Sequence, residues 1–155
     1  MEIADCAYAA GLIDGEGSIG LEGYGSGSNF RSPYISMSST TTELTDYMLQ
    51  YFGGHISIKR RHNANPNHSQ AFVWKIRGHA ALTMLELIGD YLREEKKREK
   101  SDKLRREYLK VTKPNGKYTE IERARKIDFQ NQFLEIGTSR TKLQLSALQN
   151  HKKDI

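Results

Sequence analysis

The stretch AAGLIDGEGSIGL, residues 9–21, decides the fold, because it joins a helix to a strand without a linker. The residues up to Gly11 have the composition of a helix, and from residue 16 onward the pattern alternates as in a strand. Asp14 and Glu16 are therefore expected where the helix passes into the strand, between glycines that leave the backbone bare. The letters DGEG also favour an ordinary turn, so on their own the two acids indicate no chemistry.

The rest of the chain continues with short strands and helices. Hairpins between helices are typical of an antiparallel sheet with helices on one face. We therefore expect an α+β fold, an αββαββα core with an antiparallel four-stranded sheet and extra C-terminal helices. A single domain would span 1–155, with a core over about 3–110 and a helical extension over about 111–155. The expected strands are 16–24, 31–39, 55–61 and 70–77, and the expected helices are 3–13, 40–52, 79–92, 93–110, 119–136 and 139–150.

Composition restricts the class of protein. The 155 residues are enough for one domain, and the formal net charge of +5 with a pI near 9.3 favours a polyanionic partner. Cys6 is the only cysteine, which excludes an internal disulfide and a cysteine-based zinc site. No signal-peptide pattern and no membrane-length apolar run is visible, so we expect a soluble, intracellular protein with no membrane partner, in a prokaryotic cytoplasm or an organelle.

The middle of the chain lacks acidic residues. None occurs between Asp46 and Glu86. Helices on one side of the sheet would leave its other face uncovered, and ordinary solvated faces mix both charge signs. We therefore predict that the uncovered face binds nucleic acid. The basic residues of this stretch are Lys59, Arg60, Arg61, Lys75 and Arg77.

Small residues recur along the first helix. Ala7, Gly11 and Gly15 are four residues apart, so they share a face that lets another helix approach closely, within the domain or in a second copy. Hard divalent cations prefer carboxylate and carbonyl oxygens, and the Asp14–Glu16 turn supplies half of such a site. Two copies brought together would form a paired acidic centre suited to metal-assisted phosphodiester hydrolysis.

The motif AAGLIDGEGSI resembles the signature of the LAGLIDADG homing endonucleases. Residues 11–14 match it letter for letter, Glu16 stands in place of the second acid, and Gly15 and Gly17 complete it. Downstream, ISMSSTTTEL, YFGGHISI and FVWKIRG resemble the second to fourth strands of the family with their helix, and DYLREEKKREK resembles its later basic segment. The resemblance covers residues 3 to about 110 and implies the single-motif, homodimeric type.

The resemblance implies a role for each matched position. Glu16 would be the principal metal ligand, with the Gly15 carbonyl beside it, and Asp14 would orient the motif. Ser39 stands where the family often has Asn or Gln near the phosphate. Lys96 or Lys97 would approach the scissile phosphate, with Lys96 preferred. The dimer contact would be lined by Ala7, Ala10, Gly11 and Ile13, and the DNA-binding side chains would be Ser18, Tyr24, Arg31, Ser57, Lys59, Arg61, Gln70, Lys75 and Arg77.

The implied activity is sequence-specific hydrolysis of both strands of DNA by a homodimer at a long, near-palindromic site. A divalent metal would activate water and leave short 3′ overhangs. Mg²⁺ would be the cofactor, with Mn²⁺ or Ca²⁺ able to occupy the site in vitro, and intron homing would be the biological role. No nucleotide cofactor is expected, because GYGSGS lacks the Lys-Ser/Thr of a phosphate loop.

Two alternatives stay open. One is a protein of the same fold that has lost cleavage and acts as a DNA-binding regulator or an RNA maturase. The other is a nuclease with a histidine-bound metal, although the spacing of its candidate residues matches no zinc template. Those candidates are His55, His62, His68 and His79.

Overall fold

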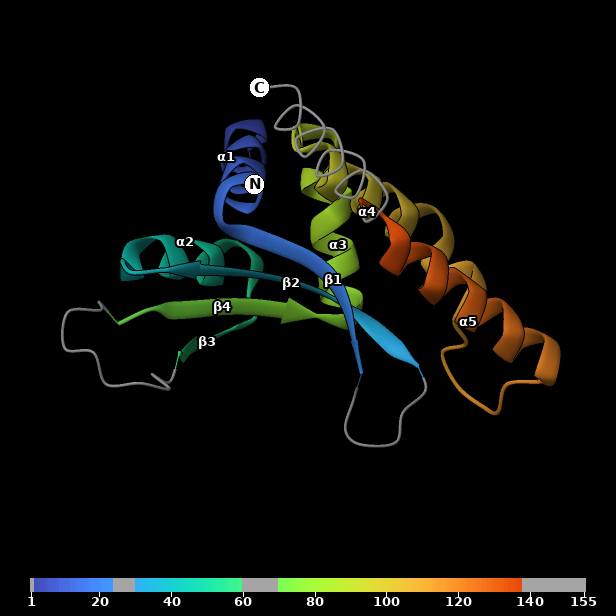
Figure 1. Cartoon of the computed structure of the whole chain (residues 1–155). Coiled ribbons are helices and arrows are strands. Elements are labelled where there is room, and N and C mark those ends of the chain that lie inside the picture. The colour runs from blue at the N-terminus through green and yellow to red at the C-terminus, as the bar shows by residue number, and fades with distance from the viewer. Residues whose placement is uncertain (1, 24–29, 60–69, 138–155) are drawn as a thin grey trace, which may run out of the picture.

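Helices cover one face of a four-stranded sheet in the computed structural model, which describes residues 2–23, 30–59 and 70–137 (Figure 1). The predicted α+β class with a four-stranded antiparallel sheet is confirmed. In chain order the elements are α1 (Ile3–Glu16), β1 (Gly17–Gly23), β2 (Arg31–Ser39), α2 (Thr42–Phe52), β3 (His55–Ile58), β4 (Phe72–Arg77), α3 (Gly78–Ile88), η1 (Gly89–Tyr91), α4 (Glu95–Glu107), η2 (Tyr108–Val111) and α5 (Glu120–Glu135).

The sheet has the strand order β1-β2-β4-β3, and every neighbouring pair is antiparallel. One row across it joins Ile19, Ile35 and Ile76. The next row on the same face, two residues further along the strands, contains Met37 and Trp74. Side chains alternate between the two faces of a strand, so these apolar rows define the face that the helices cover. All five side chains are at most 3% exposed.

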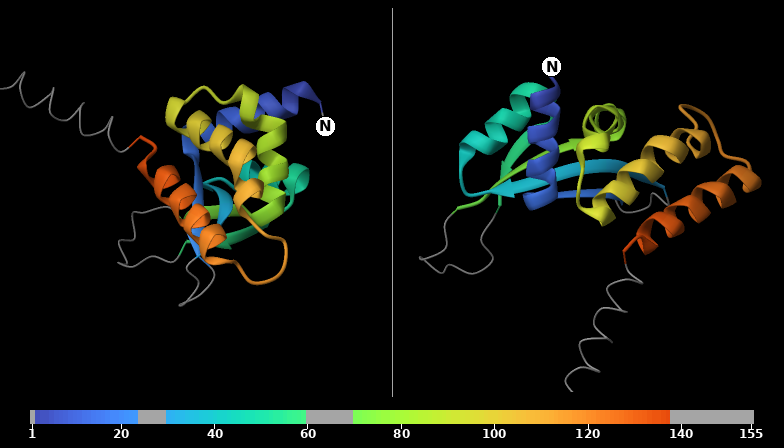
Figure 2. Two further views of the ribbon diagram at one scale, coloured as in Figure 1. Left: turned by 90° about the vertical axis from the view of Figure 1, so that its right-hand side faces the viewer. Right: turned by 90° about the horizontal axis from the view of Figure 1, so that it is seen from above.

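Helices α1, α2 and α3 lie over this apolar face, and Figures 1 and 2 show no described helix on the other one. Met48 of α2 and Leu85 of α3 are fully buried in the core. The indole N–H of Trp74 donates to the carbonyl of Gly53 at 2.8 Å, so the largest core side chain has its polar group satisfied. The face opposite the helices, called the open face below, is therefore available to a partner.

The C-terminal part of the described chain adds α4 and α5 beside the sheet (Figure 2). Lys126 of α5 is fully buried there, with its ammonium 3.7 Å from the centre of the Tyr108 ring and hydrogen-bonded to the hydroxyl of Thr112. Burial lowers the pKa of Lys126 to about 8. The backbone N–H of Arg31 donates to the Gln130 side chain at 2.6 Å, which ties α5 to the start of β2.

Some element bounds differ from those predicted. The second helix begins at Thr42 rather than residue 40, because the N–H of Thr41 bonds to the hydroxyl of Ser39 in a turn before it. The predicted helix 79–92 ends at Ile88 and continues as a short 3₁₀ turn. The predicted helix 139–150 lies outside the described residues. None of the described helices has both the length and the apolarity needed to cross a bilayer.

Candidate active site and nucleic-acid interface

The junction between α1 and β1 depends on Gly17. The N–H of Gly17 donates to the carbonyl of Ile13, which closes the last turn of α1. A Cβ atom at residue 17 would lie 2.7 Å from the Cα of Ile13 and 2.8 Å from its carbonyl oxygen, so a side chain cannot fit here. Glycine therefore lets the strand begin directly after the helix, and Glu16 stays exposed at the last helical position.

Asp14 holds the segment that leads into α4. Its carboxylate accepts the backbone N–H of Arg93 at 2.7 Å and that of Glu94 at 3.2 Å. These two residues directly precede α4, so the C-terminal end of α1 is fixed to the N-terminal end of α4. This geometry supports the orienting role predicted for Asp14.

Lys96 and Lys97 lie in the first turn of α4, close to the end of α1. The ammonium of Lys97 donates to the carbonyl oxygen of Asp14. The carboxylate of Glu94 caps α4 by accepting the N–H groups of Lys96 at 3.3 Å and Lys97 at 2.8 Å. Both predicted lysines are thus within the neighbourhood of the acidic junction.

Lys100, one turn further along α4, was missed from the sequence. With Lys96 and Lys97 it lines a hollow of about 500 Å³ that also contacts β1 and α5. Its ammonium donates to the carbonyl of Ile19 at 3.3 Å. Burial and the nearby charge of Lys96 lower the pKa of Lys100. Glu94 lines the same hollow, so three lysines and one carboxylate share it, and their net positive charge suits a phosphate. The helical spacing of residues 96, 97 and 100 was the available sequence signal.

Glu16 lines a second hollow, of about 440 Å³, together with Ser38, Ser39, Thr40 and Thr41. The structure thus brings Glu16 and Ser39 to one site. The hydroxyl of Ser39 is 3.0 Å from that of Thr41 and accepts the N–H of the same residue, so part of its role is to shape the turn before α2.

Glu16 and Gly15 can each give one oxygen to a hard cation. The carboxylate is exposed, and the carbonyl belongs to the last turn of α1, whose carbonyls have no partner further along the helix. Across residues 2–23, 30–59 and 70–137, no three His, Cys, Asp or Glu side chains gather as a metal site. The donors therefore fit a divalent ion whose remaining ligands are water, phosphate or groups of a second copy.

The residues predicted for the helix–helix contact fall on two sides of α1. Ala7 and Gly11 are exposed, together with Gly15, and a Cβ added at Gly11 or Gly15 would meet no atom of the described part of the chain within 4 Å. Ala10 and Ile13 are fully buried in this chain's own core. Only the exposed small residues are placed to contact another helix.

The predicted DNA-binding residues do not all lie on one face of the sheet. Lys75 and Arg77 of β4 lie on the open face, in the same alternation as Ser18 of β1. Ser57 of β3 lies on it too, and Lys59 follows in the same alternation. Arg31 alternates with Ile35 and Met37, which places it on the helix-covered face, so it does not share the open one. Gln70 is exposed just before β4, and Tyr24 and Arg61 lie outside the described residues.

Glu22 was missed from the sequence and pairs with both basic residues of β4. Its carboxylate forms an ion pair with the ammonium of Lys75 and lies 2.7 Å from Nε of Arg77. The Lys75 ammonium also stands 4.4 Å from the centre of the Tyr34 ring. The open face is therefore not purely basic, because β1 contributes an acid that the acid-free stretch did not contain.

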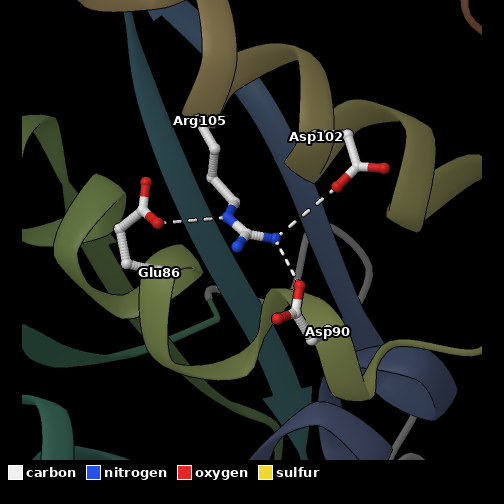
Figure 3. Close-up of polar contacts among 4 residues, drawn as sticks. All are labelled: Glu86, Asp90, Asp102 and Arg105. Carbon is white, nitrogen blue, oxygen red and sulfur yellow. Dashed lines mark hydrogen bonds and ion pairs between the residues drawn. The ribbon is translucent and has the colours of Figure 1, made fainter.

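Arg105 fixes α4 against α3 and η1 (Figure 3). Its Nε lies 3.3 Å from Glu86, and its Nη1 lies 2.8 Å from Asp90 and 3.6 Å from Asp102. A Cβ at Gly89 would come within 2.6 Å of the guanidinium, so the glycine makes room for this contact. The position of the lysines on α4 depends on this cluster.

No family model matches the chain, and no curated protein does. Several solved structures are similar. I-SmaMI, bound to uncleaved DNA target in the presence of calcium ions, is 20% identical over 81% of this chain, with a TM-score of 0.57. This chain spans only 43% of the I-SmaMI chain.

Two further structures score lower. The archaeal intron-encoded homing endonuclease I-Vdi141I, complexed with DNA, is 14% identical over 86% of this chain and 98% of its own, with a TM-score of 0.48. The group I intron-encoded homing endonuclease I-CeuI, complexed with DNA, is 17% identical over 71% of this chain and 58% of its own, with a TM-score of 0.49. The likeness to I-SmaMI confirms the predicted resemblance at the level of the fold.

Proposed function

We propose that this chain, which has the fold of the LAGLIDADG homing endonucleases, is a sequence-specific double-strand DNA endonuclease that works as a homodimer. The observation that carries the proposal is the junction at the end of α1. There the exposed carboxylate of Glu16 lines the hydroxyl-lined hollow, and the Lys97 ammonium of α4 bonds to the carbonyl of Asp14, two residues before Glu16. Carboxylates and ammonium groups together suit phosphodiester hydrolysis, in which negative charge develops on the phosphate.

Glu16 and the Gly15 carbonyl would hold a divalent ion, with Mg²⁺ as the cofactor. When bound, such an ion supplies neutralisation of the phosphate charge and activation of water. The I-SmaMI structure was determined in the presence of calcium ions, which supports a divalent metal here as well. Lys96 or Lys97 would stabilise charge on the scissile phosphate, and Asp14 would keep the helix of these lysines in place through its bonds to Arg93 and Glu94.

Dimerisation would bring two such junctions together. The exposed face formed by Ala7, Gly11 and Gly15 leaves room for a second α1 helix, because no atom of the described residues fills the space above its glycines. Ala10 and Ile13 would support this face from the core rather than contact the partner. Each chain would then contribute one acid and cut one strand, giving the short 3′ overhangs.

The open face would bind the major groove of one half-site. Ser18, Ser57 and the basic side chains of β4 project from alternating positions, which is the spacing that lets strands contact base edges. I-SmaMI is bound to an uncleaved DNA target, which supports DNA as the partner of this chain. Intron homing would be the biological use of such cleavage.

Selection followed by cleavage tests the proposal. Duplexes enriched by the wild-type protein from a randomised library are cloned into plasmids and incubated with Mg²⁺ or with EDTA. Linear plasmid that appears only with Mg²⁺ and only for enriched sites supports the proposal. Enrichment without cleavage would point to a binding protein that has lost catalysis, and no enrichment of duplex DNA would contradict the proposal altogether.

A further inference from the structure

Glu22 stands out by its charge on the open face. The described strands place twelve residues on this face, and Glu22 is the acidic one among them. The others are Ser18, Gly20, Ser32, Tyr34, Ser36, Ser38, His55, Ser57, Val73, Lys75 and Arg77. An acid on a surface that binds a polyanion weakens that binding unless the acid has a use of its own.

The sequence of β1 and β2 makes room for this acid to reach β4. β2 lies between β1 and β4, so the carboxylate crosses one strand, a span of roughly 9 to 10 Å between backbones. Ser32, opposite Glu22, is small. The Tyr34 ring folds back over Gly20, where a Cβ atom would be 2.5 Å from the ring. The path from Glu22 to Lys75 and Arg77 is therefore clear.

Stability gives little reason for this arrangement. The side chains of Glu22, Lys75 and Arg77 are 23%, 20% and 43% exposed. Oε1 of Glu22 is buried without a hydrogen bond to any described residue, so the cost of removing the carboxylate from water offsets much of the attraction between the charges. The contacts are better explained by what they do to the two cations.

Each cation is held so that part of it stays available. Oε1 of Glu22 lies 2.7 Å from Nε of Arg77 as an ion pair without hydrogen-bond geometry, so the four N–H donors on Nη1 and Nη2 are not the ones that face Glu22. Two of these donors suit the O6 and N7 acceptors of guanine in the major groove. Lys75 is held between the Glu22 carboxylate and the Tyr34 ring, which restricts its ammonium to the middle of the face.

We propose that Glu22 is a specificity-determining residue of the open face, which orients Arg77 and Lys75 towards base edges and weakens their contact with phosphates. This inference rests on the DNA binding proposed above. It predicts that each half-site has one or two G·C positions whose recognition depends on Glu22. It also predicts that removal of the charge lowers the preference for particular sequences and raises the affinity for DNA of mixed sequence.

The test compares the wild type with Glu22→Gln, which keeps the size of the side chain and removes its charge. Both proteins select duplexes from a randomised library in calcium buffer without magnesium, and their affinities for mixed-sequence DNA are measured over a range of salt. Glu43→Gln is the matched control, because it removes the same charge from α2, on the helix side of the sheet. Arg77→Lys is a second variant, which keeps the charge and loses the planar fork.

We expect Glu22→Gln to lose about ten-fold of its preference at one or two positions of each half-site, as for one bidentate base contact. Its affinity for mixed-sequence DNA should rise about three- to ten-fold, with a salt slope steeper by about one. Arg77→Lys should lose preference at the same positions, and Glu43→Gln should match the wild type.

The experiment distinguishes failure of this inference from failure of the proposed function. If the wild type enriches a site and Glu22→Gln or a folded Arg77→Lys enriches the same site with the same preferences, Glu22 does not determine specificity, and the proposed function stands. If Glu22→Gln does not fold, the Arg77→Lys result decides the proposal. If the wild type enriches no sequence, the proposed function falls and this inference falls with it.

Discussion

Gly137 lies against the side chain of Lys96. A Cβ atom at residue 137 would come within 2.7 Å of Cδ and 2.9 Å of Cε of the lysine, and the φ of Gly137 is +77°. Gly137, the second residue after α5, therefore shapes the position of a lysine at the candidate active site, although the two are far apart in the sequence.

Gly137→Ala should reduce cleavage because it displaces Lys96. Gly116→Ala is the control, since Gly116 also has a positive φ, +93°, but a Cβ there would meet nothing within 4 Å. Both variants should lose about 1–2 kcal/mol of stability from the left-handed backbone, measured by urea unfolding. Only Gly137→Ala should cleave more slowly, by about three- to ten-fold. Equal cleavage by the two variants would mean that the contact with Lys96 has no catalytic effect.

Asp14→Asn should destabilise the protein by about 1–2 kcal/mol, because an amide presents only one acceptor oxygen to the N–H groups of Arg93 and Glu94. The exposed Asp46→Asn is the control and should change stability by less than about 0.5 kcal/mol. Urea unfolding measures both. An Asp14→Asn protein as stable as its control would show that these bonds do not hold α4 in place.

Glu16→Gln should fold, dimerise and bind the enriched duplex as the wild type does, while cleavage in Mg²⁺ falls by about 10³-fold or more. The loss follows because the variant lacks the charge that would hold the metal, and one group that stabilises the transition state is commonly worth 10²–10³-fold. Glu43→Gln should cleave as the wild type does. Cleavage by Glu16→Gln at near the wild-type rate would remove the α1 junction from the mechanism.

Gly11→Leu should shift a dimer towards monomer, because the leucine would separate two α1 helices that meet at the exposed small residues. Gln50→Leu, at an exposed position of α2, controls for the added apolar side chain. Sedimentation velocity over a range of concentration, with and without the selected duplex, measures the change. A wild type that remains monomeric even on DNA would exclude the proposed dimer.

The stability of the wild type should rise with pH relative to that of Lys126→Met. The folded-state pKa of Lys126 is about 8, below the model-compound value of 10.5 that applies when the chain is unfolded. Between these two values the unfolded chain binds more protons, so the free energy of unfolding increases with pH. From pH 7.5 to 9.5 the gain over the variant should be about 1–2 kcal/mol in urea unfolding.

Lys110→Met, which replaces an exposed lysine, serves as the control for that comparison and should follow the wild type. If Lys126→Met and Lys110→Met show the same dependence on pH, the buried ammonium is not the group responsible.

Local patterns predicted most of the fold, because strand alternation and helical periodicity can be recognised within short stretches of sequence. The strands around Ile19, Ile35 and Ile76 fall where their alternation places them, and α1 passes into β1 at the glycines that the motif contains. The same alternation also indicates the correct face for Arg31, which was wrongly predicted to bind DNA from the open face. Its odd-numbered neighbours Ile35 and Met37 are apolar, and this indicates the covered face.

The ion pairs of Glu22 could not be predicted locally. Glu22 and Lys75 are 53 residues apart, and they meet only because β2 pairs with β4 rather than with β3, the strand that follows β2 along the chain. The burial of Ala10 and Ile13 has a related cause. Small and apolar residues on α1 serve both the chain's own core and an outer face, and only the packing of α1 on β2 and α3 assigns each residue to one of them.

Because α1 passes directly into β1, the strand fixes the distance between Glu16 and Glu22. Glu16 immediately precedes β1, and Glu22 lies six residues later near its far end. At about 3.3 Å per residue this is roughly 20 Å, and at about 3.4 Å per base pair the same length corresponds to about six base pairs. Arg77 and Lys75, which would contact the bases, lie in the rows of Gly20 and Ser18, four and two residues after Glu16. In the proposed complex, the base pairs whose recognition depends on Glu22 would therefore lie about two to four positions from the cut. A single inserted residue in β1 would both lengthen this spacing and turn Glu22 to the covered face.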